Sequence, residues 1–458
     1  MKLRTIKTIT LITACVLIFS FLIMGASCEE KINTVTLKAW APNGGSPLRR
    51  ENFFEAAEIL NKQLEAAGAN VRVKVECPVP GGWDAYTKAN LLALGTGEPE
   101  KIADIMIIAP EDVGSFADAG YIISLDDYIA KYPETYTDII PALWVPCEYK
   151  GKKWSVPQDT EVRMIYYHKD YLTKLGWSKN EIEKLPEKVF NGEFTLDDLV
   201  GLSEELINAG IVDKGHGFWF RPKPGADWYL YMLAYGGKLV NPETGNLFID
   251  KAAYLKSFEF MKKVVDTGIT MKGITSLDWP EWHQTVADGK VGFIQAGCYH
   301  WAEWQFRFGL DSEYAKENIG YFPIPAGVKG GKPVSVSHPM QATITSASLH
   351  KDLAFLLLTI YESVYLNSKH AVQSGHLAIR ESQLSYPLYA EDEFYVKAAK
   401  ISPISTMTPS MTGSGTLQKT YFQFVEGVLA GQLTPAKAVE LFTNQMKSQL
   451  GDVVEVAE

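Results

Sequence analysis

A regular alternation of strand-like and helix-like segments is the feature that most constrains how this chain can fold. Residues 35–40 alternate apolar and polar side chains, which is the pattern of a half-buried strand, and residues 71–75 repeat it. Residues 53–64 place their apolar side chains on one helical face, and residues 83–94 also read as a helix. Residues 105–108 are all apolar, as in a parallel strand buried on both faces. This alternation predicts an α/β fold with a largely parallel sheet.

Polar and aromatic residues follow two of these predicted strands directly. Trp40 and Asn43 come at the end of the first strand, and Ala109, Pro110 and Glu111 come after the apolar run. In open sheets of parallel strands, ligands sit outside the carboxyl ends of the strands. The sequence therefore places Trp40, Asn43 and Glu111 at the edge where a ligand is expected.

The later part of the chain carries well-marked helix starts and no sign of a linker. Thr195 with Asp198 three residues later, Asp250, and Thr434 followed by Pro435 each have the residue types that begin helices. The chain has 458 residues, without an internal repeat, a long charged run or a low-complexity segment. This length without a linker predicts two lobes joined by several short crossings.

The N-terminus has the organisation of a secretory signal. Three basic residues lie within the first seven, residues 9–23 are mostly apolar, and the small residues 25–27 precede Cys28. The segment resembles the cleavage site of a bacterial lipoprotein, although Gly25 stands where Leu is common. We therefore expect a lipoprotein signal peptide at residues 1–27 and lipidation of Cys28. An ordinary signal peptide with an incidental cysteine is the alternative, and a membrane-spanning helix is disfavoured because the apolar run is short.

Composition and motifs argue against several classes of function. The formal net charge is −10, so repulsion from phosphates argues against nucleic acid as a partner. Neither H-E-x-x-H nor G-x-S-x-G occurs, and residues 327–332 lack the spacing of a phosphate loop. The eight histidines show no metal-like spacing. Cys77, Cys147 and Cys298 cannot all pair, and whether any of them forms a disulfide stays open. We expect no enzyme, no cofactor and no bound metal.

The strongest local signal is the run Met-Ile-Tyr-Tyr-His-Lys-Asp-Tyr-Leu at residues 164–172. It resembles a segment of the family 1 extracellular solute-binding proteins, the sugar-binding components of bacterial ABC importers, with His168 in place of the usual Asn. Further segments resemble the same family in the same order, at residues 92–105, 117–128, 234–268, 288–297, 322–325 and 428–438. The resemblance covers nearly all of the chain after residue 28.

This resemblance implies a type II periplasmic-binding-protein-like fold, in which a ligand cleft lies between two α/β lobes joined by hinge crossings. Lobe one would comprise residues 28–160 and 340–385, and lobe two residues 161–339 and 386–458. The implied ligand is a carbohydrate, an oligosaccharide in particular. The implied partners are the permease subunits of an ABC importer and, through the lipid anchor, the cell membrane. An extracytoplasmic location and a monomeric state are expected.

The resemblance further implies six ligand-binding residues, which are Trp40, Asn43, Glu111, Glu161, Trp228 and Tyr299. These residue types suit a sugar. Carboxylates accept strong hydrogen bonds from hydroxyl groups, and aromatic rings cover the C–H faces of a sugar at small conformational cost.

Alternatives remain open for these residues and for the function. Glu111 could be a solvated loop charge, Glu161 could pair with a basic neighbour, Arg163 or Lys169, and the two tryptophans could belong to the core. A glycoside hydrolase needs two facing carboxylates, and Glu111 with Glu161 could supply such a pair. A solute-binding protein for a peptide, a polyamine or a metal on the same fold is the second alternative.

Overall fold

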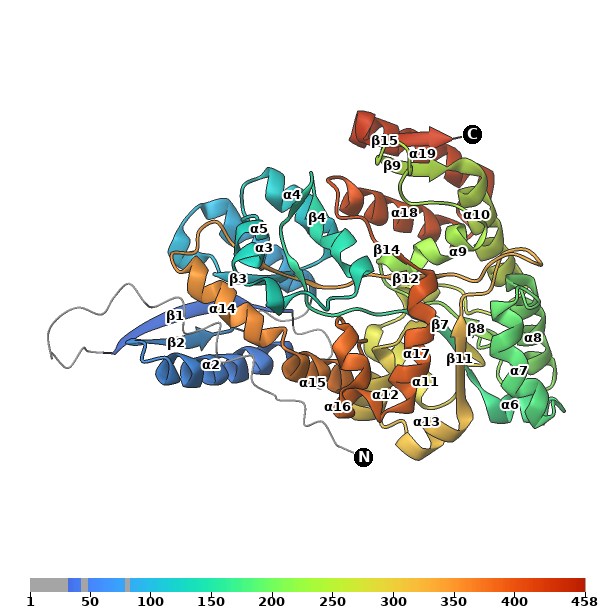
Figure 1. Cartoon of the computed structure of the whole chain (residues 1–458). Coiled ribbons are helices and arrows are strands. Elements are labelled where there is room, and N and C mark those ends of the chain that lie inside the picture. Colours follow the sequence, from blue (N-terminus) through green and yellow to red (C-terminus); the bar gives the residue numbers. More distant parts are fainter. Residues whose placement is uncertain (1–31, 43–47, 79–82, 458) are drawn as a thin grey trace, which may run out of the picture.

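The computed structural model describes residues 32–42, 48–78 and 83–457, whose arrangement is shown in Figure 1. The predicted signal peptide, Cys28 and Asn43 lie outside these described residues. Two larger sheets organise the chain, each with its own covering helices. The strands and helices before residue 157 lie at one end of the molecule, and most of those between residues 163 and 323 lie at the other (Figure 1).

The first sheet has five strands in the order β2-β1-β3-β13-β6. They are β1 (Asn33–Trp40), β2 (Val71–Glu76), β3 (Ile105–Ile108), β6 (Val156–Pro157) and β13 (Gln341–Ile344). Strands β1, β2 and β3 are parallel, whereas β13 is antiparallel to both of its neighbours. All four residues of β3 are buried, as its unbroken apolar run predicts. The predicted largely parallel sheet is therefore present, with one reversed strand.

Helices on both sides of this sheet bury its apolar faces. The longest, α2 (Leu48–Ala66), packs against α14 (Lys351–Tyr361), with the ring of Phe53 stacked 3.9 Å from that of Tyr361. Gly68 lies just beyond α2 with a φ of +68°, a conformation that favours glycine. The other helices near this sheet are α3 (Trp83–Thr96), α4 (Pro110–Asp118), α5 (Asp126–Lys131) and α15 (Val364–Ser374).

The second sheet has four strands in the order β11-β7-β10-β8. They are β7 (Arg163–His168), β8 (Phe218–Trp219), β10 (Phe293–Gly297) and β11 (Ile319–Pro323). Strand β7 is antiparallel to both β10 and β11, while β10 and β8 are parallel. Every residue of β7 is buried, and this strand is the start of the motif that carries the family resemblance.

Three helices that follow residue 163 in the chain begin where their capping residues predict. Thr195 and Asp198 form a reciprocal capping box at α8 (Leu196–Asn208), and Asp250 caps α10 (Lys251–Asp266). Thr434 caps α19 (Pro435–Leu450), with Pro435 as its first residue. The remaining helices are α6 (Lys169–Lys174), α7 (Lys179–Phe190), α9 (Tyr229–Ala234), α11 (Trp279–Ala287), α12 (His300–Phe308), α13 (Ser312–Asn318), α16 (Pro387–Ala390), α17 (Glu393–Ala398) and α18 (Ser414–Leu429).

Three two-stranded pairs complete the described structure. They are β4 (Glu148–Tyr149) with β5 (Lys152–Lys153), β12 (Ser335–Ser337) with β14 (Ser405–Met407), and β9 (Leu247–Asp250) with β15 (Val454–Ala457).

The chain crosses between the two sheets after β6 and returns to the first sheet at β13. Both reversed strands, β7 and β13, are thus the first strands after a crossing. The crossings lie side by side, because the hydroxyl oxygens of Thr160 and Ser337 are 3.0 Å apart and the amide of Gln158 donates to the carbonyl of Met340 at 2.8 Å. The lobe boundaries expected from the sequence remain a prediction.

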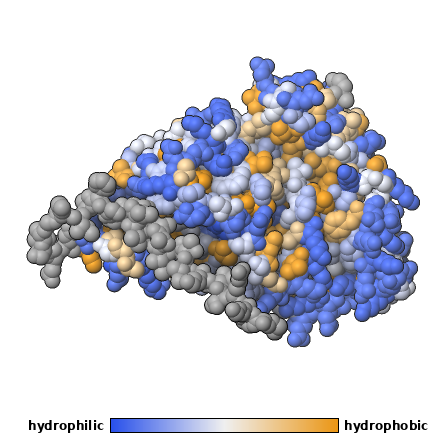
Figure 2. Space-filling model, viewed as in Figure 1, coloured by the Kyte–Doolittle hydropathy of each residue, from blue (hydrophilic) through white to orange (hydrophobic). Residues whose placement is uncertain are grey.

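The surface and the cysteines add two observations. Hydrophilic residues cover the lower right of the face shown in Figure 2, over α6, α7 and α13, while apolar residues gather nearer its centre. Within the described ranges, none of the helices has the length and apolar character needed to cross a membrane. Cys77, Cys147 and Cys298 are all buried and none is in a disulfide, so the open question of their pairing is answered.

Candidate functional site

Charged side chains gather where the crossings run between the two sheets. We call this set the junction network, and it consists of Arg49, Glu111, Asp159, Glu161, Arg163, Arg221, Asp227, Tyr299, His338 and His376. The residues come from α2, α4, the two crossings, β7, the segment between β8 and α9, the turn before α12 and the segment after α15. Elements of both sheets therefore contribute to it. Three of the six predicted ligand residues belong to it.

Glu111 lies in the first turn of α4, where the positive end of the helix favours a carboxylate. Its Oε2 lies 2.7 Å from Nε2 of His338, and both side chains are 16% exposed. Burial alone would raise the pKa of Glu111, but the charge and hydrogen bond of His338 outweigh burial and lower it. Burial would lower the pKa of His338, and Glu111 raises it above its ordinary value in return. The two groups therefore form an ion pair.

Glu161 lies in the first crossing and has a side chain only 6% exposed. Its Oε1 is 2.5 Å from Nη1 of Arg163, and Nε of Arg163 donates to Oδ1 of Asp227 at 2.9 Å. Burial raises the pKa of Glu161 although Arg163 opposes this shift. For Asp227 the charges of Arg163 and Arg221 outweigh burial and lower the pKa. The open alternative that Glu161 pairs with Arg163 is thus what the structure shows.

Tyr299 occupies the turn between β10 and α12 and is partly buried. The guanidinium of Arg163 lies 5.3 Å from the centre of its ring, and the ring of His376 is stacked against it at 5.5 Å. Gly375 ends α15 with a φ of +77°, and a Cβ there would lie 2.6 Å from the Cα of Tyr299. Only glycine fits this approach. Tyr299 is therefore fixed between the second sheet and the segment that follows α15.

Asp159 connects the first crossing to α2 and to the second crossing. One carboxylate oxygen pairs with Nη2 of Arg49, and the other accepts the amide of Met340 at 2.8 Å. Burial would raise the pKa of Asp159, but the charges of His376 and Arg49 hold it well below its ordinary value. This pair ties α2 to both crossings and completes the network on the side of the first sheet.

The remaining three predicted ligand residues have different positions. Trp40, at the end of β1, is partly buried and packs beside Phe116 and other apolar residues near the first sheet. Trp228 is 1% exposed and lies in the core, where its Nε1 donates to the carbonyl of Lys223 at 2.9 Å and its ring is 5.6 Å from that of Phe422. Trp228 presents no ring face to solvent in this conformation. Asn43 lies outside the described residues.

Several residues of the network were not among the predicted ligand residues. Arg163 was considered only as a possible partner of Glu161, and His338 was not among the expected ligand residues. Asp227 and Arg221 could not be predicted from the sequence, because no local sequence pattern identifies a buried charged residue whose partner is distant in the chain. The clue available in the sequence was Arg163 itself, a charged residue at the start of a strand that is otherwise apolar or aromatic up to His168.

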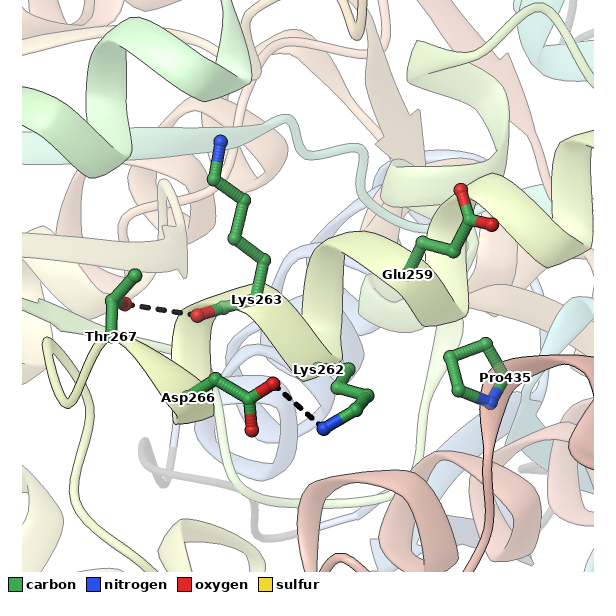
Figure 3. Close-up of a pocket in the computed structure, with 6 residues that line it drawn as sticks. All are labelled: Glu259, Lys262, Lys263, Asp266, Thr267 and Pro435. Atoms are coloured by element: carbon green, nitrogen blue, oxygen red, sulfur yellow. Dashed lines mark hydrogen bonds and ion pairs between the residues drawn. The ribbon is translucent and has the colours of Figure 1, made fainter.

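Two grooves of the described structure lie elsewhere. One, of about 380 Å³, lies beside α10 and the start of α19, and Figure 3 shows its lining. Lys262 there pairs with Asp266 at 2.7 Å. The other, of about 1430 Å³, runs along the edge strand β11 between α7 and α17. Neither of these two grooves is lined by a predicted ligand residue.

The fold is shared with solved binding proteins. The GacH receptor of Streptomyces glaucescens, crystallised unliganded and with acarbose, superimposes with a TM-score of 0.74 at 19% identity, covering 92% of this chain and 100% of that one. Maltose-bound MalE3 of T. maritima gives 0.73 at 18% identity, with 91% and 100% covered. A solute-binding protein of an ABC transporter from Thermotoga lettingae, bound with α-D-tagatose, gives 0.72 at 19% identity, with the same coverage.

Two sheets connected by paired crossings are thus the fold that this chain shares with those binding proteins. The sequence model of one family matches residues 54–363 of the chain. The chain belongs to the bacterial extracellular solute-binding protein family. The predicted family and the predicted two-lobe α/β fold class are both confirmed, and membership implies a location outside the cytoplasm.

Proposed function

We propose that this protein captures an oligosaccharide outside the cytoplasm and delivers it to the permease subunits of an ABC importer. The observation that carries the proposal is the junction network, in which Glu111, Glu161 and Tyr299 come together from elements of both sheets. Carboxylates for hydroxyl groups and a ring for a C–H face are what a sugar site requires. The similar structures carry acarbose, maltose and tagatose, which supports a sugar here.

The proposed ligand contacts are Glu111, Glu161 and Tyr299, with Trp40 and Asn43 from the end of β1 and the loop that follows. Trp228 is not included, because its ring is enclosed in the core. The crossings near residues 160, 339 and 385 would act as hinges between lobe one and lobe two. In the present arrangement α4 already touches the segment before α18, since the amide of Gly114 donates to the carbonyl of Ser410 at 2.8 Å.

A thermal-shift screen tests the ligand class. Monosaccharides and oligosaccharides are compared with peptides and polyamines, which the same fold could bind. A ligand present at about 100 times its Kd stabilises a protein by about 2.7 kcal/mol, so a true ligand raises the melting temperature clearly. A rise with an oligosaccharide supports the proposal. A rise only with a peptide or polyamine would replace it with the alternative of a non-sugar ligand.

We further propose that the protein binds its ligand without chemical change. Each of the two carboxylates that could form a glycosidase pair is engaged, Glu111 by His338 and Glu161 by Arg163. Incubation of the pure protein with aryl glycosides and with the oligosaccharide identified by the screen checks this. Steady hydrolysis that disappears in Glu111→Gln or Glu161→Gln would establish the glycosidase alternative instead.

The proposed membrane attachment runs through Cys28 as a lipid anchor, with a monomeric binding protein extending from it. Mass spectrometry of the mature N-terminus tests this directly. A diacylated Cys28 as the first residue supports the anchor, and cleavage at any other position contradicts it.

A further inference from the structure

The chain between β14 and α18 lies against α4 and the short strand β4, all of which are labelled in Figure 1. We call this stretch, with the first two residues of α18, the 408–415 segment. The amide of Gly114 in α4 donates to the carbonyl of Ser410 at 2.8 Å, and the hydroxyl of Ser410 donates to the carbonyl of Glu148 at 2.7 Å. The segment is thus bonded at one point to both α4 and β4.

A second contact lies at the end of α4. The hydroxyl of Thr412 donates to Oδ2 of Asp118 at 3.1 Å, and that of Tyr149 donates to the same oxygen at 2.6 Å. The two hydroxyl oxygens are 3.3 Å apart. Asp118 also pairs with Lys150 at 2.6 Å, and its side chain is 39% exposed. These contacts of the 408–415 segment are hydrogen bonds, whose partners water can replace when the two sides separate.

The two sides of this contact belong to different hydrophobic cores. Val113 of α4 shares a core with Ile108 of the first sheet. Leu417 of α18 belongs to the core that contains β7 of the second sheet, and Met411 of the 408–415 segment packs against that core. The hydrogen bonds therefore join two separate cores, and they can break while each core stays intact.

Gly114 is required by this contact and not by its own helix. It lies inside α4, with a φ outside the positive range that favours glycine. A Cβ at Gly114 would lie 2.5 Å from the carbonyl oxygen of Ser410 and 2.9 Å from the amide nitrogen of Thr412. Both are backbone atoms, which cannot swing aside as the end of a side chain can. Alanine is favoured over glycine inside a helix. Alanine at this position would therefore suit α4 but would exclude the docked 408–415 segment.

The same contact adjoins a proposed ligand residue. Glu111 lies three residues before Gly114 in α4. A Cβ at Gly415, in the first turn of α18, would lie 3.6 Å from the Cγ of Glu111. The 408–415 segment therefore ends beside the carboxylate proposed to hold the sugar, and its docking and the binding of ligand take place on one helix.

We propose that the 408–415 segment is a latch, which docks on α4 when the two lobes close and holds them closed. Gly114 makes the docking possible, because any larger residue keeps the segment off α4. The inference rests on the proposed closure of the two lobes, but it does not depend on which ligand is bound. Since a protein with two conformations visits both of them without ligand, the docking can be measured without a sugar.

A pair of introduced cysteines reports the docking in the absence of any ligand. Asp118→Cys and Thr412→Cys are combined, because side chains in hydrogen-bond contact can form a disulfide when the segment is docked. Mass spectrometry of the linked peptides measures the rate of disulfide formation under a mild oxidant. Adding Gly114→Ala should slow this reaction at least about fivefold, the equivalent of losing one hydrogen bond. Gly201→Ala is the matched control, because this glycine also lies inside a helix, α8, and a Cβ there would meet open space.

Equal rates with Gly114→Ala and with Gly201→Ala would overturn the proposal, and so would the absence of the disulfide in the parent pair. The melting temperature separates a latch from permanent packing. A latch can release, so the single variant Gly114→Ala should melt close to the wild type. A fall of more than about 4 °C, or failure to fold, would show that the contact belongs to the permanent fold. A sugar screen without a hit leaves these results unaffected, so failure of the proposed function and failure of the latch are distinguishable.

Discussion

The two carboxylates proposed to bind a sugar are held by different kinds of partner. Glu111 is 16% exposed and shares its hydrogen bond with His338, a group that can lose its charge. Glu161 is 6% exposed and lies against Arg163, which also holds Asp227 and keeps its charge at any ordinary pH. The part of the proposed site on α4, which we call the Glu111 half, can therefore change its charge with pH and is adjustable. The part at β7, which we call the fixed half, keeps its charges.

The largest expected effect concerns the fixed half. Replacing Arg163 with Leu leaves Glu161 without its cation and Asp227 with only Arg221, all in a buried place. Breaking a buried ion pair in this way costs about 3–5 kcal/mol. The free energy of unfolding in urea measures the loss.

A surface pair provides the control for that measurement. Lys263 pairs with Asp197 at 2.7 Å, with side chains 45% and 65% exposed, so Lys263→Ala should cost less than about 1 kcal/mol. Equal losses in the two variants would show that the Arg163 contacts are not a fixed element of the site.

The next effect compares the two halves in ligand affinity. An unmatched hydroxyl at a buried charged acceptor costs about 1.5–3 kcal/mol, so Glu111→Ala and Glu161→Ala should each weaken sugar binding about ten- to a hundredfold. Tyr299→Ala should cost a similar amount through lost stacking. Calorimetric titration measures all three. Glu65→Ala, at a side chain 74% exposed, is the control and should bind as the wild type does. Affinities within about twofold for all three variants would refute the proposed site.

The smallest effect tests whether the Glu111 half is adjustable by pH. The pKa of His338 is raised, so its contribution to stability is complete below pH 6.5 and is lost as the pH rises through the raised value. The pKa of Glu111 is lowered, so its contribution is complete above pH 4.5 and is lost on acidification. The pair therefore stabilises most between those two pH values.

The variant His338→Gln isolates the contribution of the His338 charge to stability, because glutamine can keep a hydrogen bond to Glu111 without a charge. The difference in unfolding free energy from the wild type should be about 1 kcal/mol near pH 5.5 and should shrink by pH 9. Both proteins carry Asp112→Asn, because burial and the charge of Glu111 raise the pKa of Asp112 to about 7 while the charge of His338 lowers it, so that Asp112 would otherwise titrate differently in the two. The comparison of the two proteins is thus what carries the information. A difference that does not change with pH would mean that the His338 charge plays no part.

Much of the fold could be predicted because its signals are local. The capping box of Thr195 and Asp198 and the buried strand at Ile105–Ile108 follow from residues adjacent in sequence. The reversed directions of β7 and β13 could not be predicted in this way. They depend on where the chain crosses between the sheets, which no short pattern records.

The residues of the proposed site and their partners could be predicted only in part, for a related reason. Strand ends and the family resemblance indicated Glu111, Glu161 and Tyr299. Their partners were missed where contacts join distant segments, since His338 is 227 residues from Glu111 and Asp227 is 64 residues from Arg163. Trp228 shows a different difficulty. It was expected to contact ligand but is 1% exposed, because the local sequence around a buried core tryptophan does not differ from that around a tryptophan in a binding site.

The measurement that tests the account most directly is small-angle scattering with and without the sugar identified by the thermal-shift screen. Glu111 on α4 lies beside the first sheet and Tyr299 before α12 lies beside the second. One sugar that touches both side chains would therefore draw the two proposed lobes together. The sugar stabilises the closed state by its greater affinity for that state. The account predicts that the radius of gyration falls when the sugar saturates the protein. An unchanged radius at saturation would contradict the claim that a ligand is captured by closure around the junction network.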